Sequence, residues 1–157
     1  MKTALALLAL SVGTSAFASS GSDLLGTYTS KSVVRFPGYN APDCKADGGE
    51  FDDDYCYFTD EDGNTLTITE AGKDTTVSIS VLYGAANERS FDGVVTNQSD
   101  TLLSVQEAEL AEDGSVISKI KDGCDLEVSI DQDGIADVAV GEACDSNLSR
   151  VSGAKKK

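Results

Sequence analysis

The side chains that could do chemistry in this chain are carboxylates and four cysteines, because the sequence contains no histidine. Without histidine, serine and cysteine nucleophiles lack their usual general base, and imidazole-ligated metal sites are excluded. Two carboxylates can hydrolyse glycosidic bonds when their environments separate their pKa values. Such sites also stack the sugar on an aromatic platform, and the chain has no tryptophan. We therefore predict that the protein is not an enzyme and has no catalytic residues.

The N-terminus has the features of an export signal. Lys2 precedes an apolar run from Thr3 to Val12, and Ala16-Phe17-Ala18 fits the small-x-small pattern of a cleavage site. We predict a bacterial-type signal peptide over residues 1–18, removed from a periplasmic or secreted protein. The apolar run is too short for a permanent anchor, and no later stretch is apolar enough to cross a bilayer, so no membrane insertion is expected.

The four cysteines are best interpreted as two disulfides, because their number is even and the chain is exported. Three pairings are possible, and local geometry favours Cys44–Cys56 and Cys124–Cys144. The second pair brackets a predicted hairpin, and the first would hold an acidic loop over residues 45–55. A metal site would need histidine or closely spaced cysteine pairs, which the chain lacks.

An acidic segment in the first half of the chain is one candidate calcium site. Hard cations prefer several carboxylate and carbonyl oxygens on a flexible loop. Read as an EF-hand loop, the segment would have Phe58 at its first ligand position and Thr69 at its twelfth, so the match fails at both ends. The candidate ligands here are Asp52, Asp53, Asp54, Asp60 and Asp62.

A second candidate calcium site lies between Ser129 and Asp137, with Asp131, Asp133 and Asp137 as ligands. This segment resembles the calcium loop of FG-GAP propeller repeats, with Ser129 in place of the expected first aspartate. Such repeats occur in series, and here there is one. A hairpin turn explains the same residues, so no cofactor is required and Ca²⁺ remains an alternative.

Aromatic side chains gather around Cys56, at Phe51, Tyr55, Tyr57 and Phe58. One interpretation is a patch for a ligand or partner, since tyrosine is effective at interfaces. The other is packing of a disulfide-tethered loop over one end of the fold.

Apolar and polar residues alternate along most of the chain, which predicts half-buried antiparallel strands. Asp-Gly dipeptides separate these runs and favour tight turns at positions 62, 113, 122 and 133. We interpret the dipeptide at 47 as part of the disulfide loop and that at 92 as a bulge. The expected strands cover residues 25–34, 55–59, 65–69, 76–81, 91–96, 101–107, 116–121, 126–130, 135–140 and 148–151.

These segments predict an all-β fold, an antiparallel meander of about eight or nine strands. Closure into an up-and-down β-barrel removes exposed strand edges and is preferred over an open β-sandwich. We expect one barrel domain over residues 19–152 and a basic disordered tail over residues 153–157. The segments 24–28 (Leu-Leu-Gly-Thr-Tyr) and 148–151 (Leu-Ser-Arg-Val) resemble the opening and closing strands of small lipocalin-like barrels of exported bacterial proteins.

The formal charge of −15 disfavours nucleic acid and anionic lipid as partners. Two binding functions remain for what we expect to be a monomer. In the first, the barrel interior or mouth holds a small apolar ligand, lined by Leu66, Ile68, Val77, Ile79, Leu126 and Val128. In the second, an acidic surface around residues 43–62 docks onto a cationic protein, as periplasmic inhibitors of basic wall-degrading enzymes do.

Overall fold

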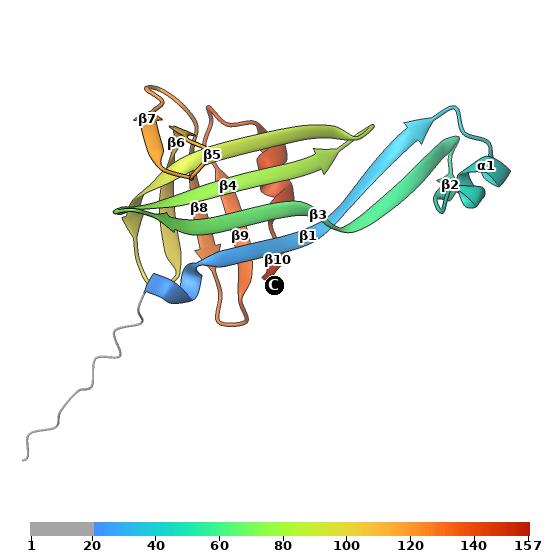
Figure 1. The fold of residues 1–157 in the computed structure, drawn as a ribbon. Helices are drawn as coiled ribbons and strands as arrows, with labels where there is room; N and C mark the ends of the chain where they lie inside the picture. Colours follow the sequence, from blue (N-terminus) through green and yellow to red (C-terminus); the bar gives the residue numbers. More distant parts are fainter. Residues whose placement is uncertain (1–20) are drawn as a thin grey trace, which may run out of the picture.

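The computed structural model describes residues 21–157, so the predicted signal peptide lies outside the described residues. A single sheet dominates this part of the chain (Figure 1). Its strands are β1 (Gly26–Pro37), β2 (Glu50–Asp52), β3 (Tyr55–Ala71), β4 (Asp74–Tyr83), β5 (Asn87–Gln98), β6 (Leu102–Leu110), β7 (Val116–Lys119), β8 (Asp125–Ile130), β9 (Ile135–Val140) and β10 (Ala154–Lys156). The short helices are η1 (Gly21–Leu24), α1 (Ala41–Ala46) and η2 (Ser146–Val151).

Eight of the strands between residues 21 and 157 close into an antiparallel barrel. Their order around the ring is β1, β10, β9, β8, β6, β5, β4 and β3, and pairing of β1 with β3 completes it. β2 is added at the edge of β3, and β7 pairs with β6 outside the ring. The predicted closed up-and-down barrel is therefore confirmed, with two additional strands.

Side chains fill the interior of the barrel. Leu66 lies opposite Ile79 and Ile68 opposite Val77, which places these alternating residues on one face of the β3–β4 pair. All six residues expected to point inward are at most 3% exposed and belong to one hydrophobic cluster. Packing is tight beside Gly93, where a Cβ atom would lie 2.7 Å from both Phe91 and Val105. The interior is thus a packed core.

Three of the four turns that the Asp-Gly pattern predicts are formed, and the fourth turn and the predicted bulge are not. Asp122, Gly114 and Gly134 adopt positive φ angles of 57°, 80° and 73° between strands. The turn expected at position 62 is wrong, because β3 continues through it and is paired with β1 on both sides of a bulge. The bulge expected at position 92 is also wrong, since the register of β5 shifts between Val95 and Asn97 instead.

The C-terminal segment differs from its prediction in two places. Residues 148–151, expected as a strand, belong to η2, which begins where the Asp145 side chain accepts a hydrogen bond from the Asn147 N–H. A three-residue spacing puts Leu148 and Val151 together against the core. The tail expected to be disordered forms β10, because Ala154 is fully buried and the strand pairs with β1 and β9.

In the described part of the chain, no helix is long and apolar enough to cross a membrane.

Candidate functional site: a disulfide-held arm

An arm of residues 33–59 projects from the barrel and ends in α1 and β2 (Figure 1). It forms because β1 and β3 stay paired beyond the ring, from Val33 opposite Thr59 to Pro37 opposite Tyr55. β2 pairs with β3 along the other side, so the outer arm is a three-stranded sheet. Six of the ten aromatic residues of the sequence lie in this arm.

One face of the arm sheet is covered by α1. Phe36, Cys56 and Phe51 lie opposite one another across the three strands and share this face. The ring of Phe58 makes edge-to-face contacts with Phe36 and Tyr39, at centroid distances of 5.7 and 5.9 Å. The Cys44–Cys56 disulfide fastens α1 to the sheet, as the cysteine spacing predicts. The disulfide and the aromatic contacts together replace a larger core.

The other face of the arm sheet, which we call the tyrosine face, is not covered by any helix of residues 21–157. It consists of two cross-strand rows of exposed or half-buried residues: Arg35, Tyr57 and Glu50, then Pro37, Tyr55 and Asp52. The two tyrosine rings lie 6.4 Å apart, and the Arg35 guanidinium carbon lies 5.0 Å from the centroid of the Tyr55 ring.

The aromatic patch predicted around Cys56 is therefore divided between the two faces. Because side chains alternate along a strand, Phe51 and Phe58 lie on the face that carries Cys56 and its disulfide, while Tyr55 and Tyr57 point the other way. Sequence reasoning missed Arg35 and Glu50, which only the register of β1, β3 and β2 places beside the tyrosines. Alternation about the buried Cys56 was the signal that could have separated the tyrosines from the phenylalanines.

The arm is acidic, and three of its carboxylates, Asp52, Asp53 and Asp54, follow one another at the turn between β2 and β3, which we call the arm tip. It carries two basic residues, Arg35 and Lys45, against six carboxylates. Asp53 and Asp54 form the turn into β3 with positive φ angles of 44° and 67°, and both are exposed. The six carboxylates are Asp43, Asp47, Glu50, Asp52, Asp53 and Asp54.

Buried hydrogen bonds fix the arm where it leaves the barrel. Asn64 is 2% exposed, and its Nδ2 donates to the carbonyl oxygens of Lys31 and Arg150, at 3.0 and 3.3 Å. Its Oδ1 accepts from the Leu82 N–H at 3.0 Å. Farther out, the Arg35 N–H donates to the Gly84 carbonyl at 2.7 Å. These contacts join the arm to the turn between β4 and β5 and to η2.

We expect Asn64→Ala to lower the free energy of unfolding by about 2 kcal/mol, because it leaves the buried partners of the side chain without hydrogen bonds. Urea unfolding followed by circular dichroism measures the change. The matched control is Asn97→Ala, since Asn97 is exposed on β5. Equal stability of the two variants would show that Asn64 does not fix the junction.

The aspartates proposed as calcium ligands are spread over the arm and the barrel, and four of them, Asp60, Asp62, Asp131 and Asp137, accept hydrogen bonds from protein groups. The Asp62 carboxylate accepts from Lys157 Nζ and Thr29 Oγ1, at 2.9 and 2.7 Å, and these hydrogen bonds lower its pKa. Asp131 accepts from the backbone N–H groups of Asp133 and Ile135, as a turn residue does. Within residues 21–157, no group of three or more suitable side chains could hold a metal ion.

The other candidate ligands are spread over the arm and the barrel. Asp52, Asp53 and Asp54 occupy the arm tip, and Asp60 lies at the bulge where its Oδ1 accepts from the Asp62 N–H. Asp137 is on β9 and accepts from the Gly153 N–H. The structure thus brings the acidic residues of the arm tip together as a charged surface and leaves the β8–β9 aspartates on the barrel.

Two open depressions lie on the outside of the molecule. One, of about 580 Å³, lies over β6, β8 and β9, and its lining includes the exposed Asp125 and Glu127 and the core residues Val105 and Leu126. The other, of about 410 Å³, is at α1, between Tyr39 and Asp43.

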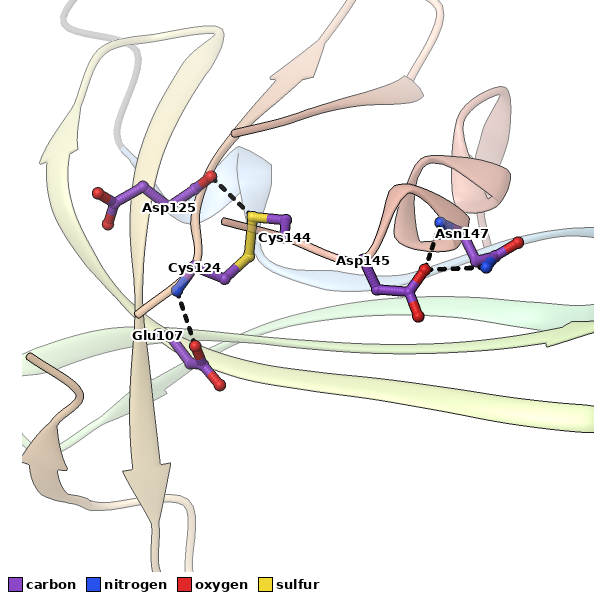
Figure 2. The surroundings of a disulfide bond; sticks show 6 residues. All are labelled: Glu107, Cys124, Asp125, Cys144, Asp145 and Asn147. Atoms are coloured by element: carbon purple, nitrogen blue, oxygen red, sulfur yellow. Dashed lines mark hydrogen bonds between the residues drawn. A yellow bond between two sulfur atoms is a disulfide. The ribbon is translucent and has the colours of Figure 1, made fainter. Parts of the chain in front are cut away.

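The second disulfide, Cys124–Cys144, ties the beginning of β8 to the segment after β9, as predicted (Figure 2). The Cys124 N–H donates to the Glu107 carboxylate at 2.7 Å. Nearby, the Asp145 carboxylate accepts from the backbone N–H and the side-chain Nδ2 of Asn147, and these bonds, that of the backbone N–H most, lower the pKa of Asp145 (Figure 2). Two disulfides indicate an oxidising, extracellular-type environment.

Comparisons with protein-family models, curated proteins and solved structures find no match for this chain. The arm combines aromatic side chains, negative charge and a hydrogen-bonded attachment to the barrel.

Proposed function

We propose that the protein is a non-enzymatic, exported binding protein whose arm docks onto a cationic protein partner. The observation that carries this proposal is the tyrosine face, an uncovered sheet surface beside an acidic tip. Tyrosine and arginine are enriched among the residues that dominate binding energy at protein interfaces. The carboxylates around them would attract a basic surface and orient it.

Two properties of the fold support docking over a ligand held within the barrel. The inward residues are packed against one another, so an interior ligand would have to displace core side chains. The arm, by contrast, is held in one shape by a disulfide and by the junction at Asn64. A surface that is already rigid loses little conformational entropy when a partner binds.

The electrostatics favour a cationic partner. The net charge of −15 repels acidic partners at long range and raises the encounter rate with basic ones. Because the tip carboxylates are exposed, their attraction is screened by salt. Binding should therefore weaken strongly as the ionic strength rises.

To test this function, the immobilised protein is used to capture proteins from its native extracellular fraction at about 0.05 and 0.5 M salt. The arm variant is Asp52→Asn/Asp53→Asn/Asp54→Asn. The control, Asp100→Asn/Asp122→Asn/Asp133→Asn, removes the same charge from exposed turns of the barrel. A captured basic protein is then purified and titrated against each variant.

We expect the wild type and the barrel variant to bind the purified basic protein at low salt, and the arm variant to bind it at least tenfold more weakly. High salt should weaken binding of the wild type by a similar factor. If no basic protein binds at low salt, or if the barrel variant loses as much affinity as the arm variant, docking through the arm is wrong.

A further inference from the structure

We infer that the tyrosine face binds an extended basic segment of the partner, with cationic side chains at every second position. This inference rests on the proposed function and adds the local shape and charge pattern of what is bound.

The spacing of the face matches an extended chain. Tyr55 and Tyr57 are two residues apart on β3, and Glu50 and Asp52 are two residues apart on β2. Two residues of a strand span about 7 Å, so each of these pairs presents its side chains about 7 Å apart. An extended segment lying along them repeats its own side chains at the same interval. Two alternate cations can therefore each meet one tyrosine and one carboxylate.

Each position combines a ring and a carboxylate. Glu50 lies directly opposite Tyr57, and Asp52 lies directly opposite Tyr55. Side chains of such cross-strand pairs are close enough for one bound group to contact both. A lysine or arginine placed there would lie against the tyrosine ring and pair with the carboxylate. The ring of Tyr55 already has a guanidinium 5.0 Å from its centroid, that of Arg35.

The charge of the tyrosine face changes from one strand to the next. The carboxylates are on β2, the tyrosines on the central β3, and Arg35 and Pro37 on β1. The Arg35 guanidinium extends from β1 over the Tyr55 ring on β3, so the bound cations should lie on the β2 side of the tyrosines, beside Glu50 and Asp52. An apolar segment would leave Glu50 and Asp52 without charged partners, which makes a basic segment the better fit.

Two synthetic peptides test the spacing. Acetyl-Thr-Lys-Thr-Lys-Thr-Thr-amide has lysines two residues apart, and acetyl-Thr-Lys-Thr-Thr-Thr-Lys-amide has the same composition with lysines four residues apart. Each is titrated into the ¹⁵N-labelled protein, and dissociation constants are taken from amide shifts. We expect the first peptide to shift the amides of Tyr55, Tyr57 and Glu50 and to bind at least fivefold more tightly.

The variant Glu50→Gln/Asp52→Asn should remove this preference. Its matched control is Asp125→Asn/Glu127→Gln, which neutralises an aspartate and a glutamate at the same spacing on the exposed face of β8 and should retain the preference. Equal affinity of the two peptides, or shifts confined to other surfaces, would overturn the inference. Capture of basic proteins through the arm would then still stand, since it depends on tip charge and not on this spacing.

Discussion

Deleting residues 154–157 is expected to abolish stable folding of the barrel. β10 occupies the place between β1 and β9, and Ala154 within it is fully buried in the core. The backbone N–H groups of Lys156 and Lys157 donate to the carbonyls of Gly134 and Thr27. Without this segment, β1 and β9 would present unpaired edges and the core would be open to water, which favours aggregation.

A thermal melt by circular dichroism and size-exclusion chromatography measure the effect of this deletion. The control is Lys155→Thr/Lys156→Thr/Lys157→Thr, which keeps the backbone and Ala154 but removes the charges. The Lys157–Asp62 ion pair is exposed, so its loss should change stability little. If the deletion variant stays monomeric and has the same melting temperature as the wild type, ring closure does not stabilise the fold.

The position of β10 illustrates which parts of the fold the sequence cannot predict. Its residues are mostly lysines, whose local pattern is typical of a solvated tail. They form a strand because they fill the gap between β1 and β9, and that gap depends on strands far away in the chain. η2 is similar: residues 148–151 resemble a closing strand in the sequence, but the Asp145 cap begins a helical turn there.

Local alternation predicted the rest of the barrel well. The hairpin of β8 and β9 forms at the expected residues, and the disulfide that brackets it is the expected one. Antiparallel strands joined by tight turns are specified by neighbours in sequence, so their signal is local. The length of β3 is the exception, because Asp62-Gly63 has the composition of a turn while the pairing with β1 carries the strand through it.

The candidate site was only half predictable for the same reason. The aromatic cluster and the acidic charge of the arm are visible in the sequence, and so is the disulfide that holds them. Which residues share a face is decided by the register of β2 and β1 against β3. That register sets Glu50 and Arg35 on opposite sides of Tyr57, and the sequence order of these residues gives no indication of it.

Removing each disulfide should separate the stability of the barrel from the function of the arm. Cys124 belongs to the barrel core cluster, and Cys144 packs against it. The bond closes a loop with a sequence separation of 20, which corresponds to about 3 kcal/mol of stabilisation from the unfolded chain. Cys124→Ala/Cys144→Ala should therefore lower the melting temperature by roughly 10 °C, with the arm still formed below the transition.

Cys44→Ala/Cys56→Ala should instead loosen the arm and leave the stability of the barrel nearly unchanged. These cysteines are buried but lie outside the barrel core cluster, and their bond fastens α1 to the arm sheet. We expect faster hydrogen exchange confined to residues 40–58, a barrel transition within a few degrees of the wild type, and at least tenfold weaker binding of the basic partner. Because a disordered arm must be ordered again upon binding, the affinity falls although every tyrosine and carboxylate is still present. Binding equal to the wild type, with the arm shown to exchange rapidly, would mean that a preformed tyrosine face is not what the partner recognises.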